Sequence, residues 1–271
     1  MSTFSFQGKQ IFYRAAGEGK PLLLLNGIMM STLSWQPFET CFTRENRLIL
    51  LDLLDQGQSD KYECEYDQSV QVEVVRALLD HPGVEKVSIM GTSYGGEVAL
   101  QFAVKYLDRV EKLVLANTVA RTNAWLREIG EAWNLAVGDP VAYYSTTIPV
   151  IYSPHFYDRR AEWMQARKEL LTRTAFASKP FLDSMIRLTN SANSHDVTAH
   201  LADISVPALI IACEMDHITP IEEQRALART MPNAQLVILP DTGHAAFYER
   251  PELFSSILLG FVNLQPPVIE L

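Results

Sequence analysis

The strongest chemical signal in the sequence is a serine flanked by glycines, in the segment GTSYGG at residues 91–96. An apolar run, 87–90, precedes this segment, and residues 97–106 have the composition of a helix. A G-x-S-x-G motif between a strand and a helix is typical of a sharp turn that lifts a serine hydroxyl above a sheet. Such a turn leaves no room for bulky side chains two positions before and after the serine, where Gly91 and Gly95 stand. The pattern therefore predicts Ser93 as a nucleophile, provided that a base and an acid follow along the chain.

Backbone amides near this serine are expected to stabilise the oxyanion that its attack creates. The N–H of Tyr94, at the start of the expected helix, is one donor. The second is expected in the loop after the apolar run 22–25, where Gly27 lets the chain turn so that the N–H of Ile28 can face Ser93. An ordinary Asn-Gly turn at the end of a strand is the alternative interpretation of this loop.

A serine hydroxyl also needs a general base, and His244 is the histidine best placed for that role. It follows the last expected strand and precedes the final helix, in a loop at the carboxyl edge of the sheet, where open α/β folds place their sites. A histidine is more often a surface or packing residue. That interpretation is given to four others: His81, His155, His195 and His200.

The acid that orients the histidine is predicted to be Asp216, just past the apolar run 208–212. The chain order is then serine, aspartate, histidine. Glu214 and Asp241 are the competing carboxylates. Glu214 lies closer to the end of the strand, and Asp241 is too close to His244 in sequence to approach it easily from behind. The acid can also follow the preceding strand in open α/β folds of this kind, but residues 117–118 are Asn-Thr and offer no carboxylate.

Short apolar runs alternate with helical patterns along the chain, which is typical of a mostly parallel sheet covered by helices. Eight strands are expected, the first two as an antiparallel hairpin: 4–6, 11–14, 22–25, 48–52, 87–90, 113–116, 208–212 and 235–239. Residues 120–203 break this rhythm with helical spacing and many aromatic side chains. We predict a helical lid, 120–203, inserted after the sixth strand of a core formed by 1–119 and 204–271.

Taken together, these motifs resemble the α/β-hydrolase superfamily over essentially the whole chain. The matching segments, in the order typical of the superfamily, are 25–27, 52–59, 91–96, 206–207, 216–220 and 243–244. The resemblance implies an α/β-hydrolase fold with Ser93, Asp216 and His244 as catalytic triad. Within the superfamily, Gly91 matches the esterase, lactonase and thioesterase pattern. The loop 26–35 is instead similar to the hydroxyacyl transferases of rhamnolipid biosynthesis, as is the pattern of Asp216, Thr219 and Glu222.

The expected lid offers a further indication of the substrate. Its aromatic side chains are expected mainly to pack, although one face of the lid would favour an apolar acyl or aryl group. Two methionines near the loop of Gly27 and Ile28, called the oxyanion loop below, could contribute to the same surface. The residues concerned are Trp125, Trp133, Tyr143, Tyr144, Phe156, Tyr157, Trp163, Phe176 and Phe181 of the lid, with Met29 and Met30. The lid carries nine basic and nine acidic residues, so it is neutral. An acidic carrier would find only Arg159-Arg160 and Arg167-Lys168 to dock on, which weighs against a carrier substrate.

Composition excludes several other classes of protein. A net charge of −9 disfavours nucleic acid as a partner. Three widely spaced cysteines fit neither a disulfide framework nor a zinc site. No export signal or membrane span is recognised, so a cytoplasmic protein is expected, and no metal or organic cofactor is implied.

These observations favour a serine hydrolase that cleaves a small or medium apolar carboxylic ester, lactone or thioester through an acyl-enzyme. The first alternative is an acyltransferase that moves a 3-hydroxyacyl group from a thioester carrier to a hydroxyl acceptor. The second is a non-catalytic ligand receptor on the same fold. A carboxylate would stand at the position of Ser93 in dehalogenases and epoxide hydrolases, so these two chemistries are disfavoured.

Overall fold

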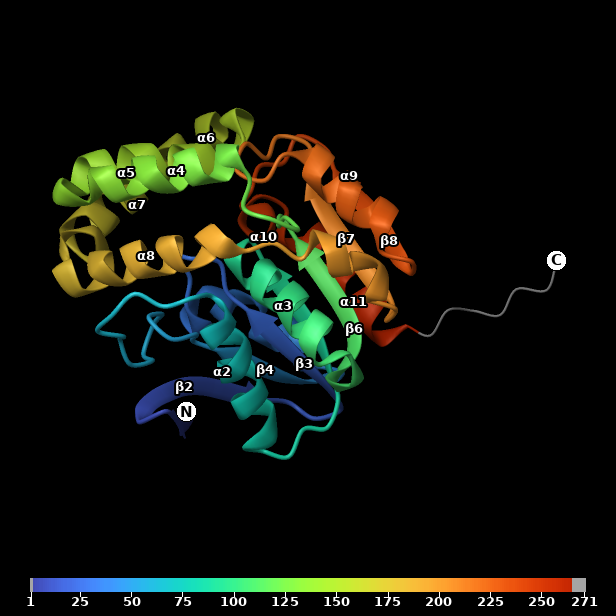
Figure 1. The fold of residues 1–271 in the computed structure, drawn as a ribbon. Helices are drawn as coiled ribbons and strands as arrows, with labels where there is room; N and C mark the ends of the chain where they lie inside the picture. The colour runs from blue at the N-terminus through green and yellow to red at the C-terminus, as the bar shows by residue number, and fades with distance from the viewer. Residues whose placement is uncertain (1, 265–271) are drawn as a thin grey trace.

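A sheet of eight strands runs through the molecule in the order β1-β2-β4-β3-β5-β6-β7-β8 (Figure 1). The computed structural model describes residues 2–264. The strands are β1 Ser2–Phe6, β2 Lys9–Ala16, β3 Lys20–Leu25, β4 Asn46–Leu51, β5 Val87–Thr92, β6 Val110–Ala116, β7 Ala208–Cys213 and β8 Ala234–Leu239. β2 pairs antiparallel with β1 and β4, and all other neighbours are parallel. The predicted eight-stranded, mostly parallel sheet is confirmed.

The central strands are apolar on both faces because helices cover both sides of the sheet. Every residue of β5 and β7 is buried. In β3, Leu23 and Leu25 belong to one apolar cluster, whereas Leu22 and Leu24 belong to a second cluster on the opposite face. This explains why the sequence shows continuous apolar runs here rather than the alternation of a strand with one wet face.

The helices divide between the two faces of the sheet and an insertion. Helices α2, α3 and α9 contribute to the larger apolar cluster, and α1 and α11 contribute to the smaller one. The helices are α1 Glu39–Phe42, α2 Ser69–Asp80, α3 Tyr94–Lys105, α4 Ala124–Leu135, α5 Pro140–Thr147, α6 Pro154–Arg159, α7 Ala161–Arg173, α8 Lys179–Ser191, α9 Ile221–Thr230, α10 Ala246–Glu249 and α11 Pro251–Asn263. Helix α3 begins at Tyr94, three residues before the expected 97–106, because it starts directly after the turn at Ser93.

Five helices, α4 to α8, form the insertion between β6 and β7. In Figure 1, α4 to α7 gather on one side of α8, which lies next to α3. The hydroxyls of Tyr94 in α3 and Ser191 in α8 are 2.8 Å apart, and Arg187 forms a 2.6 Å ion pair with the buried Asp55 of the core. The insertion is therefore anchored to the core by polar contacts as well as by packing. Its action as a lid and the division at 120–203 stay predictions.

Neither a membrane-spanning helix nor a metal-binding cluster occurs within residues 2–264. No helix in this range has the length and apolar composition to cross a bilayer. The range also contains no group of three or more His, Cys, Asp or Glu residues that could hold a metal ion. Of the three free cysteines, Cys213 is buried, Cys41 is partly buried and Cys64 is exposed.

Candidate active site

Ser93 occupies a strained turn between β5 and α3, with φ 53° and ψ −124°. Positive φ values are uncommon for residues other than glycine and concentrate at functional sites. The glycines of the motif make this turn sterically possible. A Cβ at Gly91 would collide with the backbone of Gly95, and a Cβ at Gly95 would collide with the carbonyl of Leu25 at the end of β3. The tight packing of β5, α3 and β3 thus depends on both glycines.

The structure brings Ser93, His244 and Asp216 into one hydrogen-bonded chain. His244 Nε2 lies 2.9 Å from Ser93 Oγ, and His244 Nδ1 lies 2.8 Å from Asp216 Oδ2. Because an ionised carboxylate only accepts hydrogen bonds, Nδ1 carries the proton in the neutral ring. Nε2 is then free to accept the proton of the Ser93 hydroxyl. This geometry is that of a nucleophile, its general base and an orienting acid.

Asp216 is buried but well supplied with hydrogen-bond donors. The backbone N–H groups of Ile218 and Thr219 donate to Oδ1, while the Thr219 hydroxyl and the Asn117 amide donate to Oδ2, all within 2.9 Å. Burial alone would raise the pKa of Asp216, but His244 and these hydrogen bonds outweigh it, so the pKa lies below its ordinary value. The carboxylate therefore stays ionised beside His244.

Asn117 is a site residue that the sequence analysis missed. It was considered only as the absence of a carboxylate after the sixth strand. Its Nδ2 lies 2.7 Å from Asp216 Oδ2. The sequence shows only that Asn117 directly follows an expected strand. Its approach to Asp216 depends on β6 and β7 being neighbours in the sheet, because the carboxyl ends of parallel strands meet at one edge.

The competing carboxylates and the other histidines lie elsewhere. Glu214 Oε2 accepts a hydrogen bond from the backbone N–H of Asp241 at 3.1 Å, and the structure records neither side chain in a hydrogen bond to His244. His195 is buried between the Val119 carbonyl and Gln101. His81 stacks on Phe4, with 5.9 Å between ring centroids. His155 and His200 are exposed, and their recorded hydrogen bonds join them to Arg159 and Asp203.

Two backbone amides, those of Ile28 and Tyr94, have no acceptor among residues 2–264. The N–H of Tyr94 is one of the first amides of α3, which an α-helix leaves without an intrahelical partner. Gly27 places the oxyanion loop against the nucleophile, since a Cβ there would lie 3.5 Å from the Ser93 Cβ. Both amides thus remain available near Ser93 for a developing negative charge.

The conformation of the oxyanion loop is held by the buried Asn26. Its side-chain amide donates to the Leu51 carbonyl at 2.7 Å, and its Oδ1 accepts from the Trp35 indole N–H at 2.8 Å. The Gly27 carbonyl accepts from Gln56 Nε2 and from the Met30 N–H. Asn26 and Trp35 therefore have a structural role in holding this loop.

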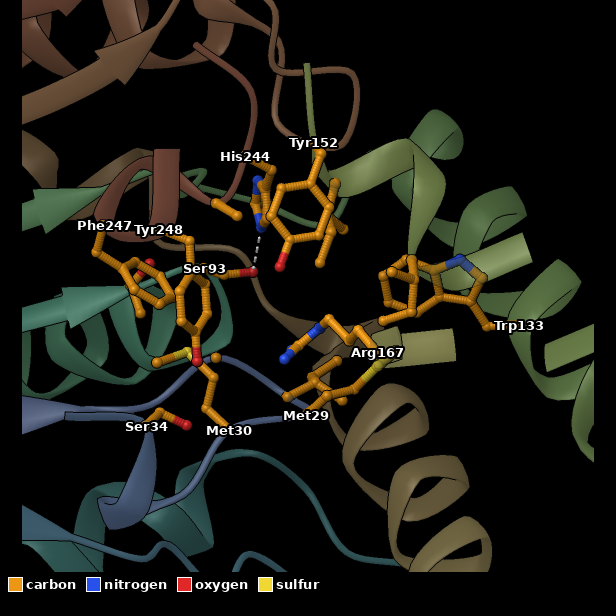
Figure 2. Close-up of a pocket in the computed structure, with 16 residues that line it drawn as sticks. Met29, Met30, Ser34, Ser93, Trp133, Tyr152, Arg167, His244, Phe247 and Tyr248 are labelled. Atoms are coloured by element: carbon orange, nitrogen blue, oxygen red, sulfur yellow. Dashed lines mark hydrogen bonds between the residues drawn. The ribbon is translucent and has the colours of Figure 1, made fainter. Parts of the chain in front are cut away.

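A cavity of about 100 Å³ opens beside Ser93 and His244 (Figure 2). Its apolar lining comes from the oxyanion loop, the insertion and α10: Ile28, Met29, Met30, Trp133, Ile148, Ile151, Ala245 and Phe247. Of the aromatic residues that the sequence suggested, only Trp133 lines this cavity. Tyr143 and Tyr144 instead pack against Phe176, so packing accounts for them.

Polar side chains in the cavity were not foreseen. Ser34, Tyr152, Arg167 and Tyr248 also line it. Arg167 was expected in a surface cluster with Lys168, but the structure turns Arg167 into the cavity (Figure 2). Two adjacent residues of a helix point about 100° apart, so Arg167 reaches the cavity while Lys168 Nζ lies 5.5 Å from the centroid of the Tyr144 ring.

Comparison with known proteins identifies the family. A model described as the alpha/beta hydrolase family matches residues 22–257. The chain belongs to the α/β hydrolase family. MGS-M2, an alpha/beta hydrolase enzyme from a Medee basin deep-sea metagenome library, is 44% identical over 100% of both chains, with a TM-score of 0.97.

Two further relatives of this α/β hydrolase are similar over nearly their whole lengths. "Putative carbamate hydrolase RutD" of Pseudomonas savastanoi pv. phaseolicola is 29% identical over 93% of this chain and 98% of that protein. A thermophilic esterase from Thermogutta terrifontis is 26% identical over 96% of each chain, with a TM-score of 0.82. The chain is thus an enzyme of the hydrolase class.

One turn after Ser93, helix α3 of this α/β hydrolase carries a buried carboxyl group, that of Glu97. It is 4% exposed and accepts a hydrogen bond from Gln68 at 2.8 Å. Burial raises the pKa of Glu97 to about 8. A carboxyl with a raised pKa holds a proton in the folded protein that the unfolded chain releases. Stability therefore falls as pH rises from the ordinary value of 4.5 towards 8.

We expect Glu97→Gln to stabilise the protein at high pH, because a neutral amide removes the cost of a buried charge. The free energy of unfolding should exceed that of the wild type by about 4 kcal/mol at pH 8.5 and by less than about 1 kcal/mol at pH 5. Denaturant unfolding at both pH values measures this difference. Glu65→Gln, at an exposed position, is the control. Equal stability of Glu97→Gln and the wild type at pH 8.5 would contradict the prediction.

Proposed function

We propose that this α/β hydrolase is a serine hydrolase that cleaves a small or medium apolar carboxylic ester, lactone or thioester through an acyl-enzyme. The observation that carries the proposal is the hydrogen-bonded chain from Asp216 through His244 to Ser93, which ends at a cavity with an apolar lining. The cavity volume of about 100 Å³ favours a small acyl group.

The reaction proceeds in two halves at the same residues. Ser93 Oγ attacks the acyl carbon while His244 Nε2 takes its proton, and the Ile28 and Tyr94 amides stabilise the oxyanion. His244 then gives the proton to the leaving group, and the acyl group stays on Ser93. In the second half, His244 takes a proton from water, whose oxygen attacks the acyl-enzyme, and the acid is released as the proton returns to Ser93. Asp216 orients His244 and stabilises its cationic form throughout.

The insertion acts as a lid in this proposal. Trp133, Ile148 and Ile151 come from the insertion and cover the cavity next to Ser93. By excluding bulk water, such side chains strengthen the electrostatic interactions of the oxyanion site. The proposed boundaries of the lid, 120–203, enclose all three residues.

Water is the proposed acceptor of the acyl group. The main argument for transfer to a hydroxyl was the similarity of the loop 26–35 to hydroxyacyl transferases. The hydrogen bond between Asn26 and Trp35 gives the first and last residues of that segment a structural role that needs no acceptor. Gly91, the esterase-like feature, fits the close contact between β5 and α3.

The acceptor is tested with a 3-hydroxyacyl thioester, supplied with and without a free 3-hydroxyacid, and with products resolved by mass spectrometry. We expect free acid as the dominant product in both reactions, because water reaches the acyl-enzyme. An ester-linked dimer as the dominant product would make the enzyme a transferase. A protein that turns over no acyl substrate and takes up no serine-directed phosphonate would be a receptor, and the proposal would fail.

A further inference from the structure

Two hydrogen-bond donors in the cavity have no partner. Arg167 Nε and Tyr152 Oη are both buried, and neither forms a hydrogen bond within residues 2–264. Figure 2 shows the Arg167 guanidinium and the Tyr152 hydroxyl pointing into the cavity on the side of the Ser93 hydroxyl. A buried donor without a partner loses the free energy of its hydration, so nearly all such groups in proteins are paired. Both donors are therefore positioned for an acceptor that the substrate brings.

The positive charge of Arg167 is held without a counterion. None of the ion pairs among residues 2–264 involves it. The guanidinium instead lies near two aromatic rings, 5.3 Å from the Trp163 centroid and 5.4 Å from the Tyr248 centroid. Contact with ring faces uses the π surface of the guanidinium and leaves its N–H edge free. The charge is thus fixed in place while its hydrogen-bond donors remain open.

The same aromatic cluster also orients Tyr152. The Tyr152 ring stacks on Phe156 and meets the edge of Trp163, at centroid distances of 5.3 and 6.1 Å. Burial raises the pKa of Tyr152, and the nearby Arg167 charge acts in the opposite direction without cancelling the rise. The hydroxyl is therefore protonated at neutral pH and acts as a donor. Trp163 thus contacts both groups, which places them as a pair.

The cavity contains no negative side chain to balance Arg167. Its lining has no Asp or Glu, and the other polar side chains in it are hydroxyls and the His244 ring. A partly buried cation without a carboxylate beside it favours an anion, because screening by water is weaker there than at a fully exposed site. A guanidinium edge with one further donor matches a carboxylate, whose two oxygens accept in one plane. A phosphate, larger and more highly charged, would leave oxygens unpaired in this small apolar cavity.

We propose that Arg167 and Tyr152 form a carboxylate-binding subsite, and that the substrates of this enzyme are acyl compounds with a second, ionised carboxylate. This proposal rests on the proposed function of Ser93 and names its substrate class. The scissile acyl carbon lies at Ser93, and the remote carboxylate accepts hydrogen bonds from the guanidinium and the tyrosine hydroxyl. Arg167 comes from α7 of the insertion, so the insertion selects the substrate while the core supplies the nucleophile.

The test compares monomethyl esters of four- to six-carbon dicarboxylic acids with esters of equal length that end in a carboxamide. The measured quantity is the ratio of kcat/KM between the charged and the neutral ester of the best length. We expect the wild type to prefer the charged ester by at least about tenfold, as hydrogen bonds to a charged group allow. Arg167→Met should lower the ratio by at least about tenfold, and Arg167→Lys should restore part of it. Tyr152→Phe, which removes only a hydroxyl, should lower it about fivefold.

Arg173→Met is the matched control, since Arg173 is exposed on the same helix and its loss changes the net charge equally. It should leave the ratio unchanged. Melting temperatures show whether each variant folds, and Arg167→Lys and Tyr152→Phe keep the test valid if Arg167→Met unfolds. A wild type without preference, or a preference that Arg167→Lys, Arg167→Met and Tyr152→Phe all leave intact, would overturn the subsite.

Binding separates this proposal from the proposed function. In a Ser93→Ala background, calorimetry with the charged ester should give a dissociation constant at least about tenfold lower than with its carboxamide, and Arg167→Met should remove the difference. Hydrolysis of both esters at equal rates would refute the subsite and leave the serine hydrolase intact. Full hydrolysis by Ser93→Ala would refute the nucleophile, while a charge preference lost with Arg167 would still support the subsite.

Discussion

Ser93→Ala is expected to lower turnover by about 10⁴- to 10⁶-fold while the protein stays folded, because the nucleophile, base and acid act as a unit. The variant loses the oxygen that attacks the acyl carbon and keeps the Cβ that packs in the turn. The only side-chain hydrogen bond recorded for the Ser93 hydroxyl in the described residues joins it to His244. Initial rates with a methyl or nitrophenyl ester, alongside thermal unfolding, measure the two effects separately.

Ser88→Ala is the matched control for this experiment. Ser88 is a buried serine of the same strand, β5, and lies outside the cavity of Ser93. Its replacement should leave turnover within about twofold of the wild type, since buried polar contacts of this kind mainly affect stability. The nucleophile assignment fails if Ser93→Ala retains turnover within tenfold of the wild type.

The arrangement of sheet, serine turn and histidine loop was predictable because each depends on local sequence. The glycines at 91 and 95 are required by backbone contacts that such a turn makes, so their spacing, together with the strand before and the helix after them, predicted it. The buried parallel strands are continuous apolar runs because both faces are covered. The strand ends then define one edge of the sheet, where Asp216 and His244 meet.

The lining of the cavity was not predictable in the same way. Whether Arg167 faces the cavity or the solvent depends on how α7 is rotated against the core, and a charged residue on a helix is usually solvated. Tyr152 lies just after the turn Pro149–Ile151, where no periodicity predicts direction. Asn117 acts through a carboxylate about a hundred residues away, a contact that only the sheet order creates.

Asp216→Asn is expected to lower turnover at neutral pH by about 10⁴-fold, the second largest effect. An amide oxygen can still accept from the Ile218 and Thr219 N–H groups, which holds Oδ1 in place. The amide NH₂ must then occupy the Oδ2 position, facing His244 Nδ1 and the Asn117 amide. The Thr219 hydroxyl, which donates to Oδ2 in the wild type, can turn and accept, but three donors would still meet there if Nδ1 kept its proton. The ring therefore adopts the other tautomer, with the proton on Nε2, where it faces Ser93 and cannot accept the serine proton.

Because the expected loss of turnover arises from the tautomer of His244, the tautomer should be measured together with the rate. Nitrogen NMR of the labelled imidazole is expected to show Nδ1–H in the wild type and Nε2–H in Asp216→Asn. Glu214→Gln is the control, since Glu214 lies in the same loop and bonds the Asp241 amide instead of His244. Its turnover should stay within about twofold of the wild type.

Full activity in Asp216→Asn, with a loss in Glu214→Gln, would transfer the role of the acid to Glu214. An Asp216→Asn enzyme that is inactive with Nδ1–H unchanged would mean that Asp216 acts through its charge on the cationic imidazolium rather than through the tautomer.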